Sequence, residues 1–279
     1  AFINKCDREG AEPARVMEEM KARLDATPIA IQLPVGIGAA LSRVIALLAM
    51  RARTWDVESF GARFTDGPIP HAQIDVASRA RETMIETIAE LDDELMAAWV
   101  AGRELPAGLV KAAIRRVTLA GRGVPTLVGA AFKNLGIHNL LDAVIDFLPA
   151  PKHGELAAID QPLSALAFKV QFDEAGSQLT FVRVYAGILR AGDAVLNATK
   201  GSNEQVGRLV RMFANHREDI RQIEAGMIGA VVYPAGSAKP IPLHFRGPLS
   251  TGDTLCDPRA PILLDPIAVP SAVMGIAVE

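Results

Sequence analysis

The chain has 279 residues, of which 50% are hydrophobic and 22% are charged; its net charge is −3 and its pI is near 6.0. This length is enough for two domains, and this composition excludes an intrinsically disordered chain. The weak negative charge excludes a protein that is basic over its whole surface, although a local basic patch is compatible with it.

The positions of the cysteines, histidines and apolar residues further restrict the class of protein. The two cysteines, Cys6 and Cys256, are far apart and lie outside any CxxC pattern, which excludes a disulfide framework and suits a reducing cytosol. Five scattered histidines lack metal-ligand spacing, so we expect no metal site. The longest apolar stretch, 34–53, is interrupted by Ser42 and Arg43, and neither part is long enough to span a bilayer. We therefore expect buried strands or helices there.

The first 150 residues alternate predicted strands and helices, as in α/β proteins. Residues 1–3 are apolar and are expected to be the last residues of a buried strand that begins elsewhere. A polar loop, 4–7, follows them where α/β proteins place binding groups, beyond the carboxyl end of a strand. Apolar spacing and proline positions then predict helices within 8–24, 72–100, 106–120 and 136–151, and buried strands within 27–36 and 124–132.

The composition changes after residue 150. A proline-containing, charged stretch at 151–161 is predicted to be a linker. The residues after it form short β-rich runs that are separated by turn sequences, which predicts a closed β-barrel or a β-sandwich. Gly187 and Gly192 are expected to supply positive φ angles in one of these turns, a role in the fold rather than in a site.

The loop Asn4-Lys5-Cys6-Asp7 matches the pattern NKxD, whose chemistry suits guanine. Guanine presents two adjacent donors, N1–H and N2–H, and one ionised carboxylate such as that of Asp7 accepts both. Adenine lacks both donors and leaves the carboxylate unpaired, at a cost of about 1–3 kcal/mol. The stem of Lys5 can cover the face of the base, and Asn4 can join the loop by hydrogen bonds. The alternative is that Asp7 is the N-cap of the helix predicted within 8–24.

A second loop, 127–134, also follows a predicted strand, and its sequence is LVGAAFKN. The small residues Gly129, Ala130 and Ala131 allow the backbone to approach a ligand closely. We expect the backbone N–H of Ala131 to donate to guanine O6. The two loops together favour a guanine-base site at the carboxyl end of the strands.

Longer stretches resemble bacterial elongation factor G, the GTPase of ribosomal translocation. The resemblance begins with AFINKCDREGAEPARVMEEMKARLDATPIAIQLPVG and continues through GRLVRMFANHREDIRQIEAG and STGDTLCDPRAPILLDPIAVP. It covers nearly the whole chain in the family's order. These long matches are far more specific than the NKxD pattern alone.

The resemblance implies an α/β portion of a GTP-binding domain followed by an all-β translation-factor barrel. The α/β portion, 1–150, would hold the last strands and helices of that domain and an inserted α+β subdomain at about 37–120. The 124 positions that separate residues 7 and 131 fit such an insertion. The barrel, domain II, would occupy 162–262, and 263–279 would begin a truncated third domain. On this basis we expect an internal fragment of the family's chain.

The resemblance also implies that the ligand is GTP or GDP and that this chain holds only its guanine part. The residues that match the family's base loops are Asn4, Lys5, Asp7, Ala130, Ala131 and Phe132. The family's phosphate-binding pattern GxxxxGK[ST] and its Mg²⁺ ligands have no match here, and no catalytic residue is assigned. We therefore predict that this chain alone does not hydrolyse GTP. Ala130 replaces the family's serine, which removes a hydroxyl that supports the loop.

In this family the barrel binds the small-subunit rRNA of the ribosome. A basic run supplies four candidate contacts, Arg208, Arg211, His216 and Arg217. The alternative is a solvated strand and loop in which Glu218 and Asp219 offset the charge. The sequence departs from the family at Met227, which replaces an acidic residue, and at 233–249, which is longer than the family's short turn.

Three functions remain open from the sequence. The first is part of a GTP-dependent elongation factor that acts with the ribosome in protein synthesis, as a cytoplasmic monomer without membrane contact. The second is a ribosome- or RNA-binding module that needs no nucleotide. The third is a non-functional gene fragment. The sequence does not separate a role in translocation from one in ribosome recycling.

Overall fold

The computed structural model describes residues 1–279 except 57, 152–158, 215, 234–247 and 268–279. The chain forms two compact units, Ala1–Pro149 and Ala150–Glu279. Most of the predicted linker at 151–161, of the long segment at 233–249 and of the stretch at 263–279 lies outside the described residues.

The first unit contains a three-stranded parallel sheet built from strands near both ends of its sequence. Its strands are β1 (Phe2–Ile3), β7 (Val124–Val128) and β2 (Pro28–Ala30), and β7 is the central strand. Ile3 is in register with Val128, so β1 and β7 end side by side. The loops that follow these two strands therefore meet at one edge of the sheet, as expected for parallel strands.

A second sheet of the same unit is antiparallel. Its strands follow chain order: β3 (Gln32–Val35), β4 (Arg43–Ala46), β5 (Arg51–Trp55) and β6 (Phe64–Gly67). The single strand predicted within 27–36 is therefore two strands in different sheets. Ile31 joins them, because its N–H donates to Thr126 O and its carbonyl accepts from Leu47 N–H. We call β3–β6 the inserted sheet, after the insertion that the resemblance leads us to expect at about 37–120.

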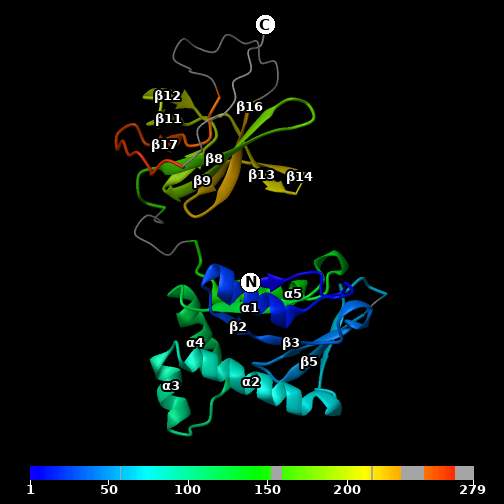
Figure 1. The fold of residues 1–279 in the computed structure, drawn as a ribbon. Helices are drawn as coiled ribbons and strands as arrows, with labels where there is room; N and C mark the ends of the chain where they lie inside the picture. Colours follow the sequence, from blue (N-terminus) through cyan, green and yellow to red (C-terminus); the bar gives the residue numbers. More distant parts are fainter. Residues whose placement is uncertain (57, 152–158, 215, 234–247, 268–279) are drawn as a thin grey trace. The chain divides into compact units, whose positions relative to one another are not determined.

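Five helices accompany these sheets in the described part of the first unit (Figure 1). They are α1 (Pro13–Leu24), α2 (Ile74–Ala89), α3 (Asp93–Val100), α4 (Ala107–Leu119) and α5 (Ile137–Phe147). Helix α1 begins five residues later than its predicted range, at Pro13, since proline suits the first helical position. The helix predicted within 72–100 is two helices. The first ends at Ala89, and Asp92 is the N-cap of the second, where it accepts Leu95 N–H at 2.9 Å.

The first unit has two apolar clusters. The larger one packs α2 and α4 against both sheets, with fully buried Ile29, Ile45, Leu47, Ile88 and Ile114. The smaller one, which we call the loop core, lies under the loops that follow β1 and β7. Its buried members are Ile3, Cys6, Leu41, Val44, Trp55, Val128, Ala130 and Leu135.

The second unit is β-rich, and its main sheet has eight strands (Figure 1). In spatial order they are β12 (Ser202–Gln205), β11 (Ala194–Asn197), β17 (Thr254–Cys256), β8 (Ser164–Phe172), β9 (Gln178–Ala186), β16 (Ile228–Tyr233), β13 (Arg208–Phe213) and β14 (His216–Ile220). Strands β10 (Ile188–Arg190) and β15 (Gln222–Glu224) form a separate pair. Val195 and Leu209, from opposite parts of the strand order, share one core, so the sheet curls around it.

Two sequence expectations concern this framework. Gly187 and Gly192 have φ angles of 69° and 88°, which confirms that both supply left-handed turns. The apolar stretch at 34–53 forms strands of the inserted sheet rather than one long element. None of the helices in the described part of the chain combines the length and the apolar character that crossing a bilayer requires.

Candidate functional site

The loop after β1 carries three polar side chains, those of Asn4, Lys5 and Asp7, and one fully buried side chain, that of Cys6. Cys6 is fully buried; its Sγ donates to Ile3 O at 3.2 Å and its backbone N–H donates to Gly129 O at 3.0 Å. Burial raises the pKa of the Cys6 thiol, so the group is neutral and acts in packing. Lys5 has a left-handed backbone (φ 63°), which turns the exposed Asn4 and Lys5 away from the core while Asp7 stays half-buried.

The loop after β7 is a short 3₁₀ turn, Ala131–Lys133. Ala130 and Leu135 close it by two backbone hydrogen bonds of 2.9 and 3.1 Å. Asn134 and Gly136, with φ angles of 56° and 85°, lead the chain from this turn into α5. The turn leaves the side chain of Phe132 fully exposed.

Two contacts join the loops at their outer edge. Asn4 Oδ1 accepts the backbone N–H of Ala131 at 2.9 Å, and also that of Lys5 at 2.8 Å. Asp7 Oδ2 lies 2.9 Å from Lys133 Nζ. The structure thus brings Asn4, Asp7 and Ala131 together, as NKxD and its companion loop predict.

Three findings differ from the sequence expectations for this site. Asp7 does not cap α1, because the helix begins at Pro13 and Asp7 faces Lys133 instead. The N–H of Ala131, expected to face guanine O6, is occupied by Asn4 in this structure. Lys133 was not assigned from the sequence; its signal is a single cation two residues after Ala131, which gains meaning only once the two strands are in register.

The electrostatics favour an ionised acceptor. The hydrogen bond from Lys133 holds the pKa of Asp7 below its usual range, an effect that burial partly opposes. Asp7 is therefore a carboxylate at neutral pH, the form that accepts two neighbouring N–H donors.

Three of the four basic residues predicted to contact RNA pair with carboxylates. Arg208 pairs with Asp219, Arg211 with Glu218 and Arg217 with Asp173, the last two at 2.8 Å. His216 is exposed on β14. The hairpin of β13 and β14 therefore presents arginine side chains whose charge is largely offset by neighbouring carboxylates.

Strands β8 and β9 carry cations over aromatic rings. Lys169 Nζ lies 5.2 Å from the ring centre of Phe181, and the Arg183 guanidinium lies 5.0 Å from that of Tyr185. Among the described residues, neither cation forms an ion pair. Sequence reasoning missed this pair of contacts, although the alternation along β9 signals that Phe181, Arg183 and Tyr185 share one face.

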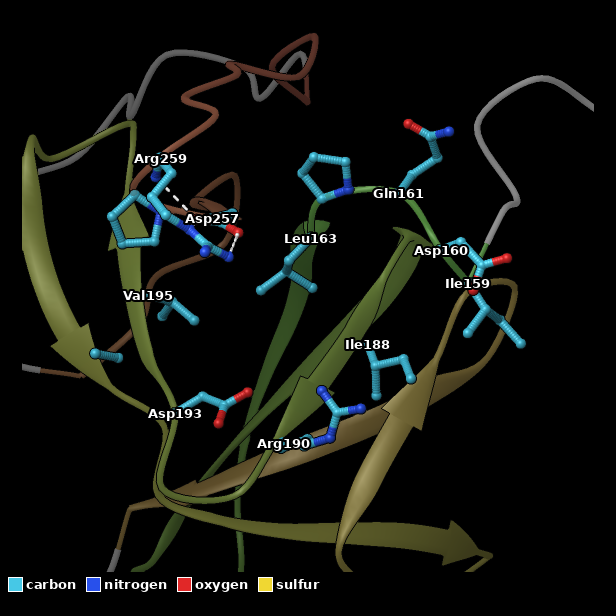
Figure 2. A pocket seen from close by; sticks show the side chains of 13 residues that line it. Ile159, Asp160, Gln161, Leu163, Ile188, Arg190, Asp193, Val195, Asp257 and Arg259 are labelled. Atoms are coloured by element: carbon cyan, nitrogen blue, oxygen red, sulfur yellow. Dashed lines mark hydrogen bonds and ion pairs between the residues drawn. The ribbon is translucent and has the colours of Figure 1, made fainter.

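A cavity of about 650 Å³ also lies in the second unit. Figure 2 shows Asp257 and Arg259 paired on one side of it and Arg190 and Asp193 on another, over an apolar floor that includes Leu163. Side chains of both signs line it, Asp160, Asp193 and Asp257 with Arg190 and Arg259, so its chemistry selects neither an anion nor a cation. No cluster suited to a metal ion occurs in the part of the chain that the structure describes.

Known families account for this pair of loops. Residues 1–150 match the family of the elongation factor Tu GTP binding domain. The chain belongs to this family. Residues 162–257 match elongation factor G domain 2. The NKxD loop and its companion loop both lie within the residues that match the elongation factor Tu GTP binding domain.

The similarity to elongation factor G extends over the whole chain, which confirms the resemblance read from the sequence. Elongation factor G from two strains of Anaplasma marginale, Florida and St. Maries, is 41% identical over 294 aligned positions that include all of this chain. The chain spans 41% of the length of these relatives.

A solved structure supports the fold. The crystal structure of ttk003000868 from Thermus thermophilus matches with a TM-score of 0.70 and 22% identity, over 94% of this chain and 36% of that chain. At this identity the likeness concerns the fold alone. With the two family matches it confirms the predicted class, an α/β portion of a GTP-binding domain followed by a β-rich domain.

Proposed function

We propose that this chain is the guanine-recognition and ribosome-docking part of a GTP-dependent translation elongation factor of the elongation factor G type. One observation carries the proposal: Asn4 and Asp7 of the NKxD loop lie against Ala131 and Lys133 of the second loop, at the shared edge of β1 and β7. This arrangement favours the first of the three functions read from the sequence over a nucleotide-independent module or a non-functional fragment.

The ligand is a guanine nucleotide, GTP or GDP, bound through its base. Asp7 accepts N1–H and N2–H, the stem of Lys5 covers one face of the base, and O6 takes the Ala131 N–H in place of Asn4 Oδ1. Ala130 and Phe132 complete the second loop around the base. No cluster of metal-binding side chains occurs among the described residues, and the proposal assigns no role to a metal.

The test exchanges the acceptor for an amide. Asp7→Asn presents one acceptor and one donor, which matches the N1–H and O2 of xanthine instead of the two donors of guanine. We expect the wild-type chain to prefer GDP over XDP and the variant to reverse this preference, each by tenfold or more, measured by titration calorimetry. Asp25→Asn, a remote exposed aspartate at the end of α1, is the matched control. Equal affinities for both nucleotides in the wild-type chain would contradict the proposal.

We further propose that the second unit contacts small-subunit rRNA, and that the chain acts as a monomer in the cytoplasm. Four residues from the sequence are candidates on the β13–β14 hairpin, Arg208, Arg211, His216 and Arg217. Carboxylates offset three of them, so Lys169 and Arg183, which lie over aromatic rings, are the stronger candidates. Cations and aromatic rings on one surface suit unpaired RNA bases and their phosphates.

A pair of variants tests the RNA contact. Replacing both Lys169 and Arg183 by alanine should weaken binding to small ribosomal subunits and reduce the slope of log affinity against log salt by about 1–2, because up to two phosphate contacts are lost. Arg208→Ala removes a cation that Asp219 already neutralises, so it should change the slope less. A larger loss from Arg208→Ala would return the contact to the β13–β14 hairpin.

A further inference from the structure

The inserted sheet contributes directly to the core beneath the two base loops. Val44 and Trp55 come from strands of the inserted sheet and Leu41 from the turn between β3 and β4, and each is less than 10% exposed. They pack in the loop core with residues that lie in or beside the base loops: Ile3, Cys6, Ala130 and Leu135. The base loops therefore rest on side chains from a different sheet.

The first loop is also held by a backbone contact from the inserted sheet. Gly38, in the turn between β3 and β4, donates its N–H to Cys6 O at 2.9 Å. Cys6 lies between Lys5 and Asp7, so this bond fixes the backbone segment from which both base-binding side chains project. Gly38 has a φ of 66°, a conformation that glycine adopts without strain.

The second loop receives a matching contact from the turn between β5 and β6. Asn134 Nδ2 donates to Phe60 O at 3.1 Å. Gly61 lies so close to the second loop that a Cβ on it would stand 2.5 Å from Lys133 O and 3.1 Å from Leu135 Cδ2. Lys133 is the residue whose ammonium binds Asp7, so this turn supports the second loop at the point where it meets the first.

We infer that the inserted sheet is a positioning element of the base site: its turns at Gly38 and at Phe60–Gly61 set the spacing of the two loops and thereby the affinity for guanine. This inference rests on the proposed function. The sheet touches no part of the base in that arrangement. Displacing it from the loop core loosens both loops together, because both rest on its side chains and turns.

The test uses one glycine and a matched control. Gly61→Ala introduces a left-handed strain (φ 70°) and a Cβ that collides with Lys133 O. We expect GDP affinity to fall at least tenfold while far-UV circular dichroism is unchanged. Gly102→Ala carries a similar strain (φ 62°) but its Cβ meets no atom within 4 Å, so its GDP affinity should equal that of the wild type.

A second readout reports on the loop core itself. The chain has two tryptophans, Trp55 in the loop core and Trp99 on α3, which is 40% exposed. In a Trp99→Phe background, GDP binding should change the emission of Trp55, and Gly61→Ala should reduce that change. Asn134→Ala removes the bond to Phe60 O and places alanine at a left-handed φ of 56°. It should weaken GDP binding by a smaller factor than Gly61→Ala and serves if Gly61→Ala does not fold.

The outcomes separate this inference from the proposed function. If the wild-type chain binds GDP and Asp7→Asn shifts it to XDP, but Gly61→Ala and Asn134→Ala bind GDP as the wild type does, the positioning role is wrong and the base site stands. Equal losses in Gly61→Ala and Gly102→Ala also overturn the positioning role. A wild-type chain that binds no guanine nucleotide overturns the proposed function, and the positioning role with it.

Discussion

Lys133 and Asp7 form an ion pair between residues that lie 126 positions apart in the sequence. The side chain of Lys133 is 52% exposed and that of Asp7 is 14% exposed, so solvent screens the pair from one side. Such pairs contribute little to folding, typically less than about 1 kcal/mol. The main consequence of the pair is therefore local: it lowers the pKa of Asp7 and directs its carboxylate at the second loop.

Removing Lys133 should raise the pKa of Asp7. Lys133→Met deletes the hydrogen bond that chiefly lowers this pKa, so the Asp7 carboxyl should titrate closer to its usual range in carbon-13 NMR. The folded-state pKa is the lowered one, so the pair's small stabilisation is complete above the unfolded carboxyl pKa of about 4 and is lost as pH falls through the folded value. Lys111→Met, which removes the partner of Asp146 instead, should leave the Asp7 titration unchanged.

The sequence predicted part of this site for a local reason. Asn4 and Asp7 belong to one short motif, so their joint role is visible in four consecutive residues. The Asn4–Ala131 and Asp7–Lys133 contacts depend on the parallel register of β1 and β7, which are far apart in the chain. No pattern within either loop encodes that register, and this is why Lys133 and the occupied Ala131 N–H were not predicted.

The break between α2 and α3 shows the same contrast, between local patterns and long-range contacts, at the level of helices. Apolar positions continue at helical spacing from 74 to 99, so the sequence favours one helix. Asp92 ends it, because its carboxylate accepts Leu95 N–H as the N-cap of α3 and two hydrogen bonds from Arg116 on α4, each near 2.8 Å. The partner on α4 is a tertiary contact, and the helical pattern carries no information about it.

Asp92→Ala should destabilise the first unit by about 2–4 kcal/mol, because it removes an N-cap and a carboxylate that is only 5% exposed. The measurement is urea unfolding followed by tryptophan fluorescence at pH 7. The hydrogen bond from Arg116 lowers the pKa of Asp92, so the difference between variant and wild type should be largest above about pH 4 and shrink as pH falls through the folded pKa. Asp93→Ala, the exposed neighbour in the first turn of α3, should cost less than about 1 kcal/mol.

At the scale of the whole molecule, the sequence predicted a boundary near residue 150, because the composition and the pattern of apolar residues change there. Alternating strand and helix patterns give way to closely spaced strands, and the two compact units divide between 149 and 150. The sequence did not predict that residues 27–36 form two strands in different sheets. Ile31 hydrogen-bonds to both sheets of the first unit, and a short apolar run is equally compatible with one strand or two. Long-range order of strands is set by packing that no local window contains.

The two units have separate cores, which gives a prediction for the intact chain. The main core of the first unit contains Ile88, and that of the second contains Leu209; no residue belongs to both clusters. Ile88→Ala and Leu209→Ala should each cost about 2–5 kcal/mol in their own unit, since both side chains are at most 1% exposed. Both tryptophans, Trp55 and Trp99, lie in the first unit, so tryptophan fluorescence reports on that unit.

Thermal unfolding of the two variants therefore has an asymmetric expected result. Ile88→Ala should lower the midpoint that tryptophan fluorescence reports, and Leu209→Ala should leave that midpoint in place while lowering a second transition in scanning calorimetry. The physical reason is that each substitution leaves a cavity among side chains of one cluster only. If Leu209→Ala shifts the fluorescence midpoint as far as Ile88→Ala does, the units unfold as one cooperative body, and loss of the second core then weakens the base site as well.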